Sequence, residues 1–271
     1  MKKILVSIDF SDNAQNALDY ALYLFEKEAC TFYLLHAYHD TPLLPATKLT
    51  RKDELNQLLK HTQVRNNNPK HQFKTVIETD SVVNLINRTV IDNAVNFIFM
   101  GTKGYTTLHE VFLGSNTVDV IKHLQCACPI VAVPKDYNYD IPKEILFATD
   151  FKHGFIAPEL MPLNTISKLW NSAVSVVHIN TEKELSEDQK ENKTLLRTSL
   201  KPIKSKFMEV KMKNSIASTI YRLEKENPKI GMVALLNTKH GFFKNLLREP
   251  IIKNMSFRTE IPLLVLQQIV E

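Results

Sequence analysis

Glycine and cysteine are scarce in this chain of 271 residues, which contains six glycines and three cysteines. An odd and sparse set of cysteines is not a disulfide framework, so a small disulfide-stabilised scaffold is excluded. The sequence has no run of 18 apolar residues and predicts no membrane span. Its N-terminal apolar run is short and reaches Asp9 without a small-residue cleavage site. We interpret that run as a first strand and expect a cytoplasmic protein.

A block of charge of one sign is also lacking. The net charge of +5 is spread over mixed lysine and glutamate faces, a pattern that does not indicate a nucleic-acid partner. His123, Cys126 and Cys128 lie close together but match no tetrahedral zinc spacing, so we expect buried structural thiols there. With 44% hydrophobic and 23% charged residues, the chain has the composition of a folded protein, and its length suits two domains.

The first half of the chain alternates strand and helix patterns. Short apolar runs predict strands at residues 4–8, 31–37, 73–78, 96–100 and 130–133. Helical spacing of apolar residues and cap signals predict helices at residues 14–28, 50–64, 81–93 and 117–124. Strands separated by helices in this way indicate a parallel sheet covered by helices, and right-handed crossovers make such a sheet doubly wound.

The second half repeats the first. Three segments recur in the same order: residues 144–151 parallel 3–10 at an offset of 141, residues 174–178 parallel 32–36, and residues 260–266 parallel 127–133. The join lies at about residues 135–143. We therefore predict a tandem duplication with domains at residues 1–138 and 139–271. Each is expected to be a doubly wound α/β unit with a five-stranded parallel sheet flanked by helices.

Half of the glycines fall within residues 100–117, as Gly101, Gly104 and Gly114. Glycine lets the backbone approach a phosphate closely, and the first N–H groups of a helix are free. A strand, a glycine-containing stretch and a helix in this order therefore predict an anion site. Ser115 and Asn116 are expected to cap the helix and to offer further hydrogen bonds.

Two other predicted strand ends favour an anion site here over an ordinary turn. Asp9 and Ala37 follow the first and second strands, as Gly101 follows the fourth. In open α/β sheets ligands bind beyond the carboxyl ends of the strands, where the strand order reverses. The three positions are thus expected to share one ligand site.

The spacing of these glycines resembles a known signature. Gly101, Gly104 and Gly114, followed by Ser115 and Asn116, form the pattern G-x2-G-x9-G-S-N, which is similar to that of the ATP-binding branch of the universal stress protein family. Residues 4–11 and 129–133 also resemble the first and last strands of that family, and the resemblance extends over both halves. It implies a Rossmann-like fold of the adenine nucleotide alpha hydrolase type.

The resemblance implies an adenine nucleotide as ligand, with ATP as the first choice and ADP or AMP as alternatives. Mg²⁺ or Mn²⁺ would accompany the phosphates, held mainly by phosphate oxygens and water. The implied binding residues are Ile8, Asp9 and Ala37 toward adenine and ribose, Met100 and Gly101 beneath the ribose, Lys103 and Gly104 beside the phosphates, and Gly114, Ser115, Asn116 and Thr117 around them.

The family also implies pairing of the two domains through their fifth strands, at residues 130–133 and 263–266. An apolar edge strand is an aggregation hazard unless it is covered, which supports this expectation. The arrangement leaves room for a homodimer as well.

The glycine stretch is not repeated intact in the second half. Asn237 is expected in the place of Gly101 and His240 in that of Gly104, with Arg248, Glu249 and Pro250 near the counterpart of Gly114. A carboxylate there would repel a phosphate, and proline removes a backbone donor. We expect this domain to have lost the phosphate site, although Arg248 alone can still attract an anion.

Three functions stay open at this point: a nucleotide-binding regulatory or sensor module of the stress response, a slow ATPase, and a scaffold that binds no nucleotide. The sequence has no Walker lysine motif, no G-x-S-x-G elbow and no H-E-x-x-H, so we expect weak ATP hydrolysis at most and assign no catalytic residue. His109 and Glu110 are interpreted as a solvated lid. The sequence names no protein partner and no particular stress.

Overall fold

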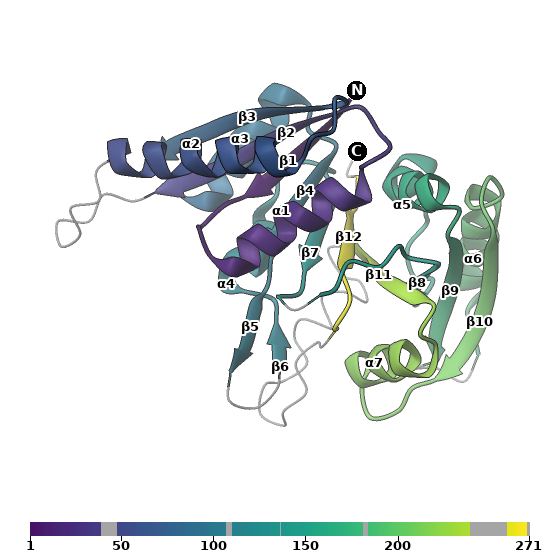
Figure 1. Ribbon diagram of the computed structural model, residues 1–271. Coiled ribbons are helices and arrows are strands. Elements are labelled where there is room, and N and C mark those ends of the chain that lie inside the picture. The colour runs from purple at the N-terminus through teal and green to yellow at the C-terminus, as the bar shows by residue number, and fades with distance from the viewer. Residues whose placement is uncertain (39–47, 107–109, 136, 181–183, 239–258, 270–271) are drawn as a thin grey trace. The chain divides into compact units, whose positions relative to one another are not determined.

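A computed structural model describes residues 1–38, 48–106, 110–135, 137–180, 184–238 and 259–269 (Figure 1). The chain divides into two compact units, one made of residues 1–102 and 114–135 and the other of residues 103–113 and 136–271. Both are parallel sheets flanked by helices, so the predicted α/β class is confirmed. The domain limits of 1–138 and 139–271 stay a prediction. None of the helices in the described ranges is both long and apolar enough to cross a bilayer.

The sheet of the first unit has five parallel strands in the order β7-β4-β1-β2-β3. Its strands are β1 (Lys2–Ser7), β2 (Cys30–Tyr38), β3 (His71–Thr79), β4 (Phe97–Gly101) and β7 (Ile130–Val133). Its helices are α1 (Asp12–Leu24), α2 (Lys48–Arg65), α3 (Val82–Asn93) and α4 (Ser115–His123). The glycine stretch also contains a short antiparallel pair that the sequence did not predict, β5 (Lys103–Thr106) and β6 (Glu110–Phe112).

Helix α1 shows why these residues form these elements. Ser11 has an extended backbone and its hydroxyl accepts a hydrogen bond from the Ala14 N–H at 3.3 Å, which starts the helix. The face that packs on β1, β4 and β7 carries small buried residues such as Ala17 and Ala21, so the helix can lie close to the sheet. Beneath it, the β1 residues 4–6 are fully buried. The apolar run at the N-terminus is thus the central strand of this sheet.

The second unit repeats this topology. Its parallel strands lie in the order β12-β11-β8-β9-β10, which is the first unit's order element by element. The strands are β8 (Glu144–Thr149), β9 (Ala173–Asn180), β10 (Ser205–Lys211), β11 (Ile230–Asn237) and β12 (Leu263–Gln267). The helices are α5 (Ala157–Trp170), α6 (Glu187–Ser199) and α7 (Ile216–Glu226).

Strand register shows which residue of the second unit corresponds to Gly101. The equivalent pairs are Ile4 with Phe97 in the first unit and Ile145 with Met232 in the second. Counting along β4 and β11 from these pairs places Leu236, not Asn237, at the position of Gly101. The predicted alignment was therefore wrong by one residue, because it followed residue likeness after the strand, whereas strand pairing sets the correspondence.

Candidate functional site

The predicted ligand positions of the first unit gather at the carboxyl edge of its sheet. Strand β1 lies between β4 and β2, and all three run in the same direction. Ile8 and Asp9 follow β1, Ala37 lies near the end of β2, and Gly101 ends β4. The chain order reverses between β1 and β4, so this edge is the switch point at which α/β sheets bind ligands.

Asp9 sits in the turn between β1 and α1 and is exposed. Its Oδ1 accepts hydrogen bonds from the Ser11 N–H at 3.0 Å and from the Ser11 hydroxyl at 2.5 Å. The carboxylate thereby positions the residue that caps α1. Across the described part of the chain, both of its hydrogen bonds use the same oxygen, so Oδ2 is available to a ligand hydroxyl.

A ring pair that the sequence did not flag fixes the end of β1. Phe10 has φ of 61°, an uncommon value for a residue with a side chain. Its ring lies 4.6 Å from that of His36, whose Nδ1 lies 2.7 Å from the Ile8 carbonyl oxygen. The guanidinium of Arg51 lies 5.6 Å from the Phe10 ring on the same edge. Burial lowers the pKa of His36, which keeps the imidazole neutral, and a neutral ring bonded to a carbonyl is a positioning group.

Gly101 is required by packing against α1. A β-carbon built there would lie 2.5 Å from the backbone oxygen of Asn13, in the first turn of α1. Only glycine lets α1 approach the end of β4 this closely. The absence of a side chain brings the start of α1 against the end of β4. The predicted contact of this glycine with a ligand stays a prediction.

Helix α4 begins without a side-chain cap. Its N-cap is Gly114, which makes no side-chain hydrogen bond, and Ser115 and Asn116 are the first two helical residues. The prediction that they cap the helix was wrong, since glycine already holds the capping position. Both are exposed, so their side chains stand beside the first-turn N–H groups. An uncapped N-terminus with exposed polar side chains is suited to bind an anion.

The remaining predicted binding residues differ in the burial of their side chains and in the elements that carry them. Ile8, Met100 and Thr117 are buried, so they can offer a ligand only backbone groups. The Thr117 hydroxyl donates to the Gly101 carbonyl at 3.2 Å, which ties α4 to β4 and makes it a positioning group. Lys103 and Gly104 lie in β5, and Glu110 lies in β6. His109 lies outside the described residues.

Two buried polar atoms near Gly101 were missed by sequence reasoning. In the described part of the protein, Asn13 Oδ1 and Thr102 Oγ1 have no hydrogen-bond partner. Asn13 packs on Gly101, and Thr102 directly follows it. Buried polar atoms are nearly always paired, so these two fit a ligand that offers hydroxyl or amine groups there. Nothing in the spacing of asparagine and threonine could have marked them.

The cysteines near α4 show no metal-binding arrangement. Within the described ranges, no three His, Cys, Asp or Glu side chains are grouped as metal ligands. The His123 Nδ1 lies 2.9 Å from the Asp119 carbonyl oxygen, within its own helix. Burial raises the pKa of both Cys126 and Cys128, which keeps these thiols protonated at neutral pH.

Comparison with known proteins gives this architecture a family. Residues 1–134 match the model of the universal stress protein family, which includes every strand and helix of the first unit. Residues 1–134 of the chain belong to the universal stress protein family. A universal stress protein of Synechocystis sp. is 27% identical over 148 residues, covering 48% of this chain and 96% of that protein.

Solved structures extend the likeness of fold to both halves of this universal stress protein. A universal stress protein from Archaeoglobus fulgidus superposes with a TM-score of 0.73 at 13% identity, covering 98% of each chain. A putative universal stress protein from Pseudomonas aeruginosa gives a TM-score of 0.58 at 14% identity, covering 98% of this chain and 93% of the other. At such identities the likeness concerns the fold alone.

The second unit of this universal stress protein keeps the ring pair but not the glycine. Phe151 has φ of 56°, and its ring stacks on that of His178 at 5.0 Å. Lys193 of α6 lies 5.6 Å from the Phe151 ring, as Arg51 does from Phe10 in the first unit. The end of β8 is thus held as the end of β1 is.

A leucine and a longer turn replace the close contact between helix and strand. Leu236 is buried at the position of Gly101. Seven residues, 150–156, separate Thr149 from the start of α5, so the helix begins later than α1 does. In this turn His153 pairs with the buried Glu159 at 2.8 Å. Segment 239–258, with the predicted His240, Arg248, Glu249 and Pro250, lies outside the described residues.

Proposed function

We propose that the first unit binds an adenine nucleotide, with ATP as the best candidate, and that the protein acts as a regulatory or sensor module of the stress response. The observation that carries this proposal is the uncapped start of α4 beside the turn that holds Asp9. The dipole of a helix N-terminus contributes about 0.3–1 kcal/mol for each favourable charge, and its free amides add hydrogen bonds.

The proposed binding residues form two groups, one around the phosphates and one around the ribose and adenine. The amides of residues 115–117, with the side chains of Ser115 and Asn116, would hold the phosphates. Asp9 Oδ2 would accept from a ribose hydroxyl, and the half-buried Ala37 would line the adenine. The unpaired Asn13 Oδ1 and Thr102 Oγ1 fit the polar middle of such a ligand. Mg²⁺ or Mn²⁺ would be held by phosphate oxygens and water, which requires no carboxylate cluster.

The described part of this site offers no arrangement for efficient hydrolysis. The carboxylate directly beyond β1, that of Asp9, is engaged in positioning Ser11. A nucleotide bound here would therefore act by its presence, stabilising the folded first unit by mass action. Its phosphorylation state after purification reports on any slow turnover.

The test is to denature freshly purified protein and identify the released small molecules by chromatography and mass spectrometry. We expect about one adenine nucleotide per chain, or uptake of one on titration with Mg-ATP. Two per chain would show that the second unit also binds. If no nucleotide is released and none is taken up at millimolar Mg-ATP, the nucleotide proposal is wrong and the scaffold function remains.

We also propose that the units pair through β7 and β12, each the terminal strand in the order of its own sheet. A cysteine introduced into each strand should then form a disulfide within one chain, seen as the loss of two free thiols while the chain stays monomeric on non-reducing electrophoresis. Disulfides between chains would instead support a homodimer.

A further inference from the structure

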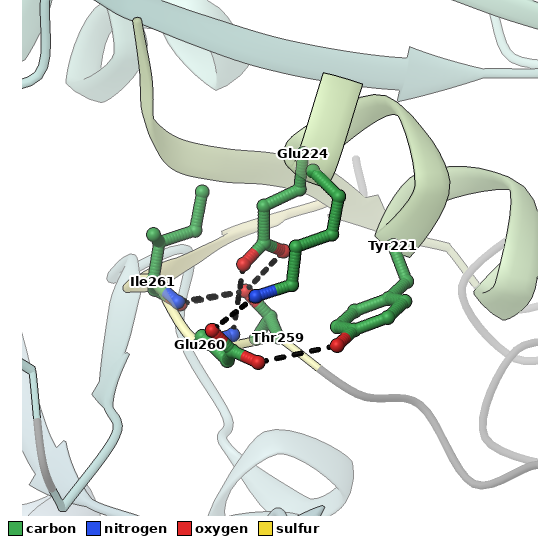
Figure 2. A network of polar contacts seen from close by, with 6 residues as sticks. Tyr221, Glu224, Thr259, Glu260 and Ile261 are labelled. Atoms are coloured by element: carbon green, nitrogen blue, oxygen red, sulfur yellow. Dashed lines mark hydrogen bonds and ion pairs between the residues drawn. The ribbon is translucent and has the colours of Figure 1, made fainter. Parts of the chain in front are cut away.

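Glu224 of α7 is a buried carboxyl group, 7% exposed, in the second unit. It holds the chain that leads into β12, as Figure 2 shows. Its Oε1 accepts a hydrogen bond from the Glu260 N–H at 3.0 Å, and its Oε2 lies 3.2 Å from the Thr259 hydroxyl. One side chain thus fixes two consecutive residues of this segment against α7.

The hydrogen bonds of Thr259 decide where the protons lie. Its hydroxyl oxygen is 2.8 Å from the Ile261 carbonyl oxygen and accepts from the Ile261 N–H at 3.2 Å. A hydroxyl has one proton and two lone pairs. When that proton goes to the Ile261 carbonyl, the nearer acceptor, what faces Glu224 Oε2 is a lone pair. The contact is then a hydrogen bond only if Glu224 carries a proton.

We propose that Glu224 is a pH-responsive anchor, which holds residues 259–261 against α7 as a neutral carboxylic acid and loosens them when it ionises. When Glu224 is ionised, its carboxylate and the Ile261 carbonyl both require the single Thr259 hydroxyl proton. One of these two acceptors is then left without a donor. It also places a buried negative charge beside a second carboxylate, that of Glu260. This anchor does not depend on nucleotide binding in the first unit.

The charged groups around Glu224 do not neutralise it. The Glu260 carboxylate accepts from the Tyr221 hydroxyl at 3.2 Å and from Lys225 Nζ, so the nearest cation is committed to Glu260 (Figure 2). The pKa of Glu224 is raised to about 7, and burial is the largest cause. The Glu260 charge also raises it, while the hydrogen bonds with Glu260 N–H and Thr259, together with the Lys225 charge, act in the opposite direction.

The sign of the response follows from that direction. Because the folded-state pKa lies above the ordinary value of 4.5, the proton stabilises the anchored state fully below about pH 4.5. The stabilisation is lost as the pH rises to about 7, and above that it is constant. Neutral and alkaline conditions thus loosen the segment, and acidification tightens it.

The first unit has a counterpart of this anchor that cannot titrate. Asn87 of α3 is buried, donates to the His123 carbonyl at 3.1 Å and accepts from the Gln125 N–H at 2.8 Å. It holds the chain leading into β7 as Glu224 holds the chain leading into β12. An amide supplies a donor and an acceptor at every pH, so this anchor itself responds to pH only in the second unit.

The test is hydrogen–deuterium exchange of the full-length protein between pH 5 and 8, corrected for intrinsic exchange rates. Protection of peptides covering residues 259–267 should fall by about tenfold per pH unit between pH 5 and 7, since each unit of pKa difference is a tenfold change in equilibrium constant. The Glu224→Gln variant, whose amide supplies the donor permanently, should show no such fall. Peptides covering residues 123–133 report the first unit separately in the same samples, and their protection should not fall between pH 5 and 7.

A wild-type profile that matches that of Glu224→Gln would overturn the proposal. A second measurement needs no variant: the carboxyl ¹³C resonance of Glu224 should titrate near pH 7. Titration near the ordinary value of 4.5 would show that the residue is an ionised structural group. The matched change Glu260→Gln should lower the pKa of Glu224, because it removes the neighbouring charge.

Discussion

At the scale of single residues, the candidate site is held together by contacts within the protein. Thr117 ties α4 to the end of β4, and His36 holds the carbonyl of Ile8. Gly101 contributes by having no side chain at all. Their role is to set the distance between the first turn of α1 and the first turn of α4. A substitution at any of them would disturb binding through geometry, with folding and affinity changing together.

Gly101→Ala is expected to destabilise the first unit by about 1–3 kcal/mol, the range for overpacking a close contact. The added carbon would meet the backbone of Asn13, which cannot move aside like a flexible side chain. Urea denaturation followed by circular dichroism measures the loss. Gly154→Ala is the matched control, because the nearest atom there is the tip of the Asn192 side chain at 3.3 Å. Equal effects at the two positions would contradict the packing role of Gly101.

At the scale of elements, α4 carries the proposed phosphate contact and α5 is the comparison. Ser115→Glu places a carboxylate at the first position of α4, where a helix N-terminus favours negative charge by about 0.3–1 kcal/mol. We expect stability to rise slightly while the affinity for Mg-ATP, measured by calorimetry, falls at least tenfold. Stability and affinity changing in the same direction would argue against an anion at this end of the helix.

The matched control is Ala157→Glu, which adds the same charge at the exposed first position of α5 in the second unit. It should reproduce the gain in stability and leave the affinity for Mg-ATP unchanged. An equal loss of affinity in both variants would mean that the first one acts by long-range charge only.

A substitution of Leu236 tests, at the same scale, whether this side chain alone blocks a nucleotide site in the second unit. Leu236→Ala removes a buried side chain and should cost about 2–5 kcal/mol, as core truncations of leucine do. It should not create nucleotide binding, since the longer turn before α5 remains. Uptake of a second nucleotide by this variant, detected by mass spectrometry, would show that the leucine alone blocks a latent site.

The helices and strands were largely predictable from the sequence, but the residue-by-residue pairing of the strands was not. Alternating apolar runs and the Ser11 and Ser81 caps mark the strands and helices of the first unit, because burial and capping are local properties. The irregularity between Ile230 and Met232 falls at Gly231, and an isolated glycine in a strand indicates an irregularity without giving the register of the pairing. The unpaired Asn13 Oδ1 and the proton balance at Thr259 depend on contacts between distant segments, which only the folded chain reveals.

At the scale of the whole molecule, the two units share a topology but differ in their buried titratable groups. The first unit buries His36 and His71, and burial lowers the pKa of both. Their neutral forms stabilise the fold above the ordinary histidine pKa of 6.5, and this stabilisation is lost as the pH falls below it. The second unit responds in the opposite direction through Glu224.

We therefore expect acidification from pH 7 to pH 5 to weaken the first unit and to strengthen the second. Hydrogen exchange resolved by peptide separates the two responses in one experiment on the intact chain. His71→Gln should reduce the loss in the first unit and leave the second unchanged. Parallel responses of both units would show that the pH dependence is a general effect of net charge.

The exchange of Gly101 for Leu236 has a consequence for how the two copies can still evolve. Returning leucine to glycine in the second unit, with the longer turn in place, would open a cavity. Shortening that turn while the leucine remains would bring the first turn of α5 against its side chain. Each change alone would disrupt packing, so the difference between the two units is held in place by their cores. If the two halves arose by the predicted duplication, a new role of the second unit would be more readily gained than a nucleotide site restored.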